Sequence, residues 1–232
     1  MSINYYLGQL IGRFGYSVVR THRLPTSTLN MLKHFMDYAM EKHAVDNEFV
    51  ILQIGAFDGS YMDALSEILA KSGHYRAILV EPQPTPFKKL QQKYSNRSDI
   101  VTVNAAISDS TGIATLYVDK AQSTPLASLN RDHARHLNRG KPLKVPCMTL
   151  SDLAVSVGVT RLDAVIVDAE GYDLKILQLL FETTSFRPMV IQCEFISLNS
   201  HDRQRLATLL SDYGYKYVDV GIDTLALSRD FI

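Results

Sequence analysis

Short, almost continuous apolar runs alternate along this chain with stretches in which apolar residues recur every three or four positions. Such runs are typical of strands buried on both faces of a sheet, and five stand out: Phe49–Ile54, Ala77–Val80, Ile100–Val103, Ala164–Val167 and Met189–Cys193. The intervening stretches, such as Tyr61–Leu69 and Leu174–Phe181, have the spacing of amphipathic helices. This alternation predicts an α/β fold with a mostly parallel sheet that is covered by helices on both faces.

Both ends of the chain depart from this alternation. Near the C-terminus, the strands Tyr215–Val220 and Thr224–Leu227 are expected to join across Gly221 and to add an antiparallel edge. Ile113–Val118 is a further predicted strand, also antiparallel. Residues 1–45 show helical spacing alone, so we expect a helical N-terminal extension before one domain over residues 46–232.

The N-terminal extension has two apolar helical stretches, Tyr6–Phe14 and Leu32–Ala39. This pair either packs on the main domain or forms an arm that binds a membrane surface or another copy of the chain. Packing on the domain is favoured, because the polar face is not rich in lysine or arginine. A homodimer formed through the apolar arm is the alternative expectation.

Composition and charge narrow the classes of function. The 232 residues carry 24 basic and 24 acidic side chains, and this balance argues against a nucleic-acid-binding protein, which usually has a basic surplus. The 2 cysteines are too few for a disulfide framework or a metal cluster, so both are expected to be buried thiols. No apolar run is long enough to span a bilayer and no signal peptide is recognisable, which favours a cytoplasmic protein.

Candidate chemistry follows the ends of the predicted strands, where ligands bind in parallel α/β sheets. The first strand is followed by Gly55-Ala-Phe-Asp-Gly59, a turn in which glycines permit a close approach to a ligand. The turn has neither the glycine pattern of dinucleotide sites nor the Gly-Lys-Ser/Thr of phosphate loops. The second strand is followed by Glu81, whose carboxylate can accept hydrogen bonds from both hydroxyls of a ribose. Together these features predict a nucleoside ligand.

Small and acidic residues follow the remaining strands. The segment Asn104-Ala-Ala-Ile-Ser108 leaves room for an adenine ring, whose edge the side chain of Asn104 or Ser108 could bind. The segment Asp168-Ala-Glu-Gly-Tyr-Asp173 places three carboxylates within six residues, and Glu194 follows the fifth strand. Like charges this close together resist joint ionisation.

Four segments resemble the FkbM family of S-adenosylmethionine-dependent methyltransferases: Leu52–Gly59, Val80–Pro84, Asn104–Ser108 and Val167–Asp173. The resemblance covers roughly Asp46 to Ser228. The Glu-Pro pair and the Asp-x-Glu-Gly block are its most specific parts. It implies a class I, Rossmann-like methyltransferase fold that uses S-adenosylmethionine as its cofactor.

The cofactor-binding residues that this resemblance implies all follow the ends of strands. They are Gly55, Ala56, Phe57, Asp58 and Gly59 beside the methionine moiety, Glu81 and Pro82 at the ribose, Ala105, Ala106 and Ser108 at the adenine, and Asp168 beside the sulfonium. The chain departs from the family at Gln53, where many members carry Asp. Gln53 can still donate or accept a hydrogen bond at the cofactor's amino group, but it brings no charge.

Methyl transfer from a sulfonium is a one-step displacement in which the nucleophile, the carbon and the sulfur lie in line, so positioning supplies much of the rate. The resemblance favours a hydroxyl acceptor on a small molecule or sugar, and a base should accelerate its deprotonation. The candidate bases are Asp168, Glu170, Glu194 and His133. N-methylation of a peptide amide is a close variant. A nucleoside-binding module without catalysis is the alternative from another class.

Two further alternatives concern the same acids. Glu170 and Asp173 would serve the fold alone if they cap the helix that follows them. Asp168 and Glu194 would instead act as oxygen ligands if a metal ion assisted the reaction, although no metal is expected.

The segment Ala121–Pro142 is the longest stretch without regular apolar spacing, and it is rich in cations, among them Arg131, His133 and Arg135. Long loops within a compact domain are often lids. One interpretation is a substrate cover that supplies cations to an anionic or polyhydroxylated acceptor, and the other is a solvated charged helix.

Overall fold

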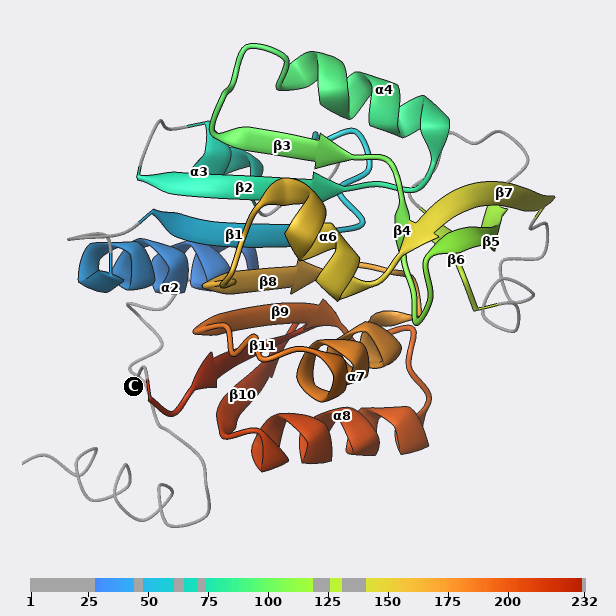
Figure 1. Ribbon diagram of the computed structural model, residues 1–232. Coiled ribbons are helices and arrows are strands. Elements are labelled where there is room, and N and C mark those ends of the chain that lie inside the picture. The colour runs from blue at the N-terminus through green and yellow to red at the C-terminus, as the bar shows by residue number, and fades with distance from the viewer. Residues whose placement is uncertain are drawn as a thin grey trace, which may run out of the picture.

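A seven-stranded sheet in the order β10-β11-β9-β8-β1-β2-β3 organises the chain (Figure 1). The computed structural model describes residues 28–43, 48–60, 65–70, 74–118, 126–130 and 141–230. The strands of this sheet are β1 (Phe49–Ile54), β2 (Tyr75–Val80), β3 (Ile100–Val103), β8 (Ala164–Val167), β9 (Val190–Glu194), β10 (Tyr215–Val220) and β11 (Asp223–Ser228).

The strands β3, β2, β1, β8 and β9 pair in parallel, whereas β11 pairs antiparallel with both β9 and β10. Every residue of β1, β8 and β9 is buried, which explains why these strands read as continuous apolar runs. The predicted fold class, a mostly parallel sheet with an antiparallel C-terminal edge, is therefore confirmed.

Alternate side chains of each strand enter two separate cores, one on each face of the sheet. Leu52 and Val165 pack with α6 (Leu150–Val157), α7 (Asp173–Thr183) and α8 (Ser200–Asp212). Ile51 and Ile166 pack on the other face with α2 (Thr28–His43), α3 (Ser66–Leu69) and α4 (Pro84–Lys93). Helices thus cover both faces, as the alternation of strands and helices predicts.

Helix α2 packs directly on the sheet. Its Leu32, Met36 and Ala39 are fully buried, and their spacing of three and four places them on one face of the helix. The other predicted N-terminal helix, over Tyr6–Phe14, lies outside the described residues. None of the described helices is both long and apolar enough to cross a membrane.

A second, four-stranded sheet stands beyond the carboxyl ends of the parallel strands (Figure 1). Its order is β4-β7-β5-β6, with β4 at Ala106–Ile107, β5 at Gly112–Val118, β6 at Ala127–Ser128 and β7 at Lys141–Met148. The antiparallel strand expected at Ile113–Val118 corresponds to β5, which pairs antiparallel with β7. The sheet covers the edge at which the candidate chemistry was expected.

Strand β7 was not predicted because two prolines interrupt its pattern. Pro142 and Pro146 pair with Tyr117 and Ile113 of β5, yet only Cys147 and Met148 pair with β4 on the other side. Most of the β4 side of β7 is therefore an open edge. A proline whose nitrogen faces an open edge removes no hydrogen bond between strands.

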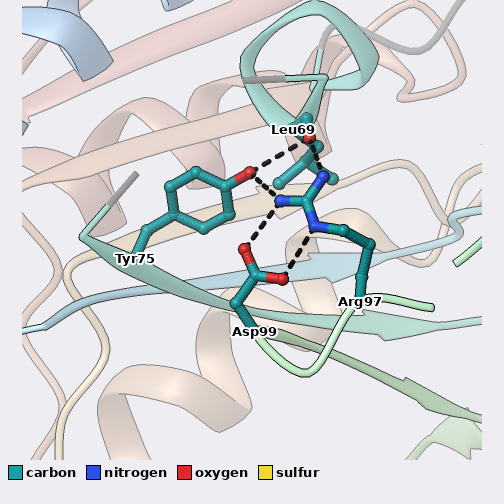
Figure 2. A network of polar contacts seen from close by, with 4 residues as sticks. All are labelled: Leu69, Tyr75, Arg97 and Asp99. Atoms are coloured by element: carbon teal, nitrogen blue, oxygen red, sulfur yellow. Dashed lines mark hydrogen bonds and ion pairs between the residues drawn. The ribbon is translucent and has the colours of Figure 1, made fainter. Parts of the chain in front are cut away.

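At the opposite end of the main sheet, Arg97, which precedes β3 in the sequence, forms a network of hydrogen bonds (Figure 2). Its Nε and Nη2 atoms donate to the two Asp99 carboxylate oxygens at 2.8 and 2.6 Å, and Nη1 donates to the Leu69 carbonyl at 2.7 Å. The Tyr75 hydroxyl accepts from Nη2 at 2.6 Å and donates to the same Leu69 carbonyl at 3.1 Å. One side chain thus joins the end of α3 to the starts of two strands.

Replacing Arg97 by Ala is expected to lower the free energy of unfolding by about 2 kcal/mol at pH 7, because four hydrogen bonds of one guanidinium are lost. Arg97→Lys keeps the charge but not the fork and should recover only part of this loss. Hydrogen bonding to Arg97 lowers the pKa of Asp99 in the folded state, so the difference should shrink as the pH falls below about 4. Urea unfolding measures it, and equal stability of Arg97→Ala and the wild type would contradict the account.

Candidate functional site

The candidate site lies where the strand order reverses, between β1 and β8. From β1 the chain proceeds to β2 and β3 on one side, and it returns through β8 to β9 on the other. Ligands bind at such switch points, beyond the carboxyl ends of the strands. A cavity of about 550 Å³, part of it open to solvent, is lined there by Ile54, Gly55, Phe57, Glu81, Pro82, Gln83, Ala105, Ala106, Ile107, Leu116, Ala127, Leu129, Asp168, Ala169, Tyr172 and Ile176.

Gly55 permits β1 and β8 to end against each other. A β-carbon at this position would lie 1.8 Å from the carbonyl oxygen of Asp168, and the φ angle of Gly55 is +87°. The Asp168 N–H donates to the Ile54 carbonyl at 2.9 Å, so the two backbones are held in this contact. A side chain is excluded at position 55 both by space and by backbone conformation.

The buried carboxylate of Glu81 holds the turn that follows Gly55. Its Oε2 atom accepts the Phe57 N–H at 2.9 Å, and its Oε1 atom accepts the Gln83 N–H at 2.7 Å. Phe57 has a φ of 47°, a strained value for a side-chain-bearing residue that this hydrogen bond helps to hold. Burial raises the pKa of Glu81 to about 7. Near pH 7 the Glu81 side chain, which lines the cavity, is therefore present in both its neutral and its charged form.

Asn104 has a supporting role that differs from its expected contact with a base edge. Its Nδ2 atom donates to the carbonyls of Glu81 and Pro82, at 2.8 and 3.2 Å. The side-chain amide thereby fixes the turn that carries the buried carboxylate. Ala105 and Ala106 line the cavity as the small wall that was expected after the third strand.

Tyr172 is a cavity residue to which the sequence analysis gave no role. Burial raises the pKa of its hydroxyl, although the Ser108 side chain forms a hydrogen bond to it. Ser108 itself is not among the lining residues, so its contact with the cavity runs through Tyr172. The position of Tyr172 inside the acidic block was the available signal, since that block follows a strand.

Three predicted site acids, Asp168, Glu170 and Glu194, lie within electrostatic reach of one another, and of these only Asp168 lines the cavity. The pKa of Glu170 is raised to about 8, first by burial and then by the negative charges of Glu194 and Asp168. Burial also raises the pKa of Glu194, although the Ser197 hydroxyl donates to its Oε2 atom at 2.8 Å. Glu170 has a φ of 50°, a sparsely populated conformation that is often found at functional sites.

Asp173, the third carboxylate of the acidic block, serves the fold. It is fully buried, and its two oxygens accept the N–H groups of Ala169 and Gly171 at 3.2 and 3.1 Å. It thus fixes the loop that presents Asp168 and Glu170. Helix α7 begins after Tyr172, whose side chain forms no cap hydrogen bond, and Asp173 stands in the first turn of the helix.

The other predicted site residues either do not line the cavity or lie outside the described residues. Gln53 is buried in β1, and Ala56, Asp58 and Gly59 lie in the glycine turn, but none of the four lines the cavity. His133, Arg131 and Arg135 lie outside the described residues. Within the described ranges, no group of three or more His, Cys, Asp or Glu side chains is arranged to hold a metal ion.

Comparison with known proteins bears on this site. A family model, the methyltransferase FkbM domain, matches residues 53–217. No curated protein matches the chain.

Three solved structures are similar to this chain at low sequence identity. The METTL16 methyltransferase domain superimposes with a TM-score of 0.50 and 14% identity, covering 96% of this chain and 76% of that one. An FkbM methyltransferase from Methylobacillus flagellatus KT has a TM-score of 0.49 and 15% identity, over 82% of this chain and 47% of that one. Aeropyrum pernix fibrillarin with natively bound S-adenosyl-L-methionine has a TM-score of 0.43 and 16% identity, over 83% of this chain and 73% of that one. The chain therefore spans about half the length of the Methylobacillus protein.

Gly55→Ala is expected to destabilise the fold more than Gly158→Ala does. Both glycines have positive φ, but an added β-carbon meets nothing within 4 Å at Gly158 and overlaps the Asp168 carbonyl at Gly55. Gly158→Ala should cost about 1 kcal/mol of backbone strain, and Gly55→Ala at least about 2 kcal/mol more, because a backbone must move. Urea unfolding compares the two variants, and equal losses would show that β1 and β8 do not meet as described.

Proposed function

Because the chain belongs to the methyltransferase FkbM family, we propose that it transfers a methyl group from S-adenosylmethionine to a hydroxyl of a small molecule or sugar. The observation that carries the proposal is the carboxylate of Glu81, which is 3% exposed and lines the cavity at the switch point. A buried carboxylate beside a glycine turn suits a neutral diol, since each ribose hydroxyl can donate to one of its oxygens.

The remaining cavity residues fit the other parts of this cofactor. Ala105, Ala106 and Leu116 provide an apolar wall suited to the adenine ring. Asp168 stands where a carboxylate would favour a positively charged sulfur. Bound there, S-adenosylmethionine would supply an electrophilic methyl group.

The acids within electrostatic reach of Asp168 suit the removal of a proton from the acceptor. A carboxylate whose pKa is raised toward the working pH is a stronger base than an ordinary one. Burial raises the pKa of both Glu170 and Glu194, and Ser197 orients the second of them. We assign the base to this pair, with Asp173 holding the loop of Glu170 in place.

The affinity for S-adenosylhomocysteine should depend on the ionisation of Glu81. Its pKa of about 7 implies that the dissociation constant rises about tenfold for each pH unit below 7, because only the carboxylate accepts from both ribose hydroxyls. Glu81→Gln should weaken binding at pH 8 at least about 30-fold and abolish this dependence. Titration calorimetry between pH 5.5 and 8 measures both effects.

Glu182→Gln, which removes an exposed acid of α7, is the matched control and should bind like the wild type. If Glu81→Gln binds with wild-type affinity and pH dependence, the ligand does not lie against Glu81 and the proposed site is wrong.

Asp168→Asn should weaken the binding of S-adenosylmethionine more than that of S-adenosylhomocysteine. Only the first ligand has a positively charged sulfur, so only its binding loses a favourable charge interaction. Because Asp168 is exposed to solvent, the dissociation constant of this ligand should rise by only about tenfold from this loss. Asp212→Asn, at an exposed acid of α8, should change neither constant. Equal weakening of both ligands by Asp168→Asn would place the sulfur away from Asp168.

A further inference from the structure

Gln83 is a polar residue of the cavity to which the proposed function gives no role. Among the described residues, the polar or charged side chains that line the cavity are those of Glu81, Gln83, Asp168 and Tyr172. Glu81 is assigned to the ribose and Asp168 to the sulfonium, and the Tyr172 hydroxyl has a hydrogen-bond partner in Ser108. Gln83 is 2% exposed, so its amide lies inside the protein.

The turn that carries Gln83 is held against the end of β3. The Glu81 N–H donates to the Val103 carbonyl at 3.0 Å, and the Asn104 side chain donates to the carbonyls of Glu81 and Pro82. The Gln83 N–H in turn donates to the Glu81 carboxylate at 2.7 Å. Gln83 is thereby fixed between the buried carboxylate and the small residues that follow β3.

Helix α4, which Gln83 precedes, does not use this amide. Gln83 occupies the N-cap position, but its side chain forms no cap hydrogen bond. Its backbone carbonyl accepts the Phe87 N–H at 3.0 Å, a bond that any residue could form. A buried amide is costly unless it forms hydrogen bonds. Because an amide has two N–H donors and an oxygen with two lone pairs, it can bind a ligand in addition to protein groups.

The position of Gln83 corresponds to the base of a bound nucleoside. The strand order β8-β1-β2-β3 places Asp168, after β8, and Gln83, after β2, beyond strands that lie about 10 Å apart. The base and the sulfur-bearing carbon leave opposite ends of a ribose, so a sulfur at Asp168 directs the base toward β3. Asn104 and Ser108, the side chains expected to bind the base edge, do not line the cavity. The lining residues that follow β2 and β3 are otherwise apolar beyond Glu81: Pro82, Ala105, Ala106 and Ile107.

We propose that Gln83 determines the specificity of the site for adenine, with its amide oxygen accepting from the exocyclic amino group and its N–H donating to the adjacent ring nitrogen. Glutamine pairs with an adenine edge in this way in nucleic-acid recognition. The proposal rests on the proposed function, since it names the residue that selects the base of the same cofactor. A base without the amino group loses one hydrogen bond and places a C–H group against the buried amide oxygen, which weakens binding.

The test compares S-adenosylhomocysteine with its purine riboside analogue, in which hydrogen replaces the amino group, by titration calorimetry at pH 8. The wild type should bind S-adenosylhomocysteine about tenfold more tightly than the analogue. Gln83→Met, which keeps the length of the side chain but has no amide, should bind the two ligands within about twofold of each other. A purely structural role would weaken both ligands alike and leave the ratio unchanged. Gln91→Met, the same substitution at an exposed glutamine of α4, is the matched control and should keep the tenfold ratio.

Equal affinity of the wild type for the two ligands, or a tenfold ratio that survives Gln83→Met, would overturn the proposal. The comparison on the wild type needs no variant, and Gln83→Leu replaces Gln83→Met if the latter does not fold. Failure of S-adenosylhomocysteine to bind the wild type contradicts the proposed function instead. Adenosine and purine riboside are then compared on the wild type and on Gln83→Met, and the proposal is wrong if the amino group gives adenosine no advantage that depends on Gln83.

Discussion

The contact between Gly55 and the backbone of Asp168 is the constraint on which the site depends. It brings the ends of β1 and β8 together at the point where the strand order reverses, and it leaves no room for a side chain. The turn that begins at Gly55 then reaches Glu81, whose carboxylate accepts the Phe57 N–H. Backbone geometry thus places a buried acid, an acid at a strand end and a glycine turn around one cavity.

The acids of this site differ in their hydrogen bonds and pKa values, and therefore in their roles. Asp173 is buried and uses both oxygens on backbone N–H groups, so it shapes the loop after β8. Glu81 also holds backbone, but it lines the cavity with a pKa of about 7, which couples its charge to the binding of a hydroxyl donor. Burial raises the pKa of both Glu170 and Glu194, and the charge of Glu194 raises that of Glu170 further, a property that suits proton transfer better than fold stability.

The sequence predicted those parts of the fold whose burial is simple. The runs of β1, β8 and β9 are buried on both faces and stand out, and Gly221 and its flanking alternation indicated β10 and β11. β7 was missed because its prolines sit on a largely open edge, which no local pattern reveals. Within the site, Gly55, Glu81 and Asp168 were found from their places after strands. The cavity lining from Leu116 and Leu129 was not, because it depends on how the second sheet packs over the first.

The central claim is that Glu81 binds the ribose of a nucleoside methyl donor at the switch point between β1 and β8. A crystal structure of the protein with S-adenosylhomocysteine tests it most directly. The account predicts both ribose hydroxyls within hydrogen-bonding distance of the Glu81 carboxylate, the adenine against Ala105 and Ala106, and the sulfur beside Asp168. A ligand bound elsewhere, or one in the cavity whose ribose does not contact Glu81, would contradict it.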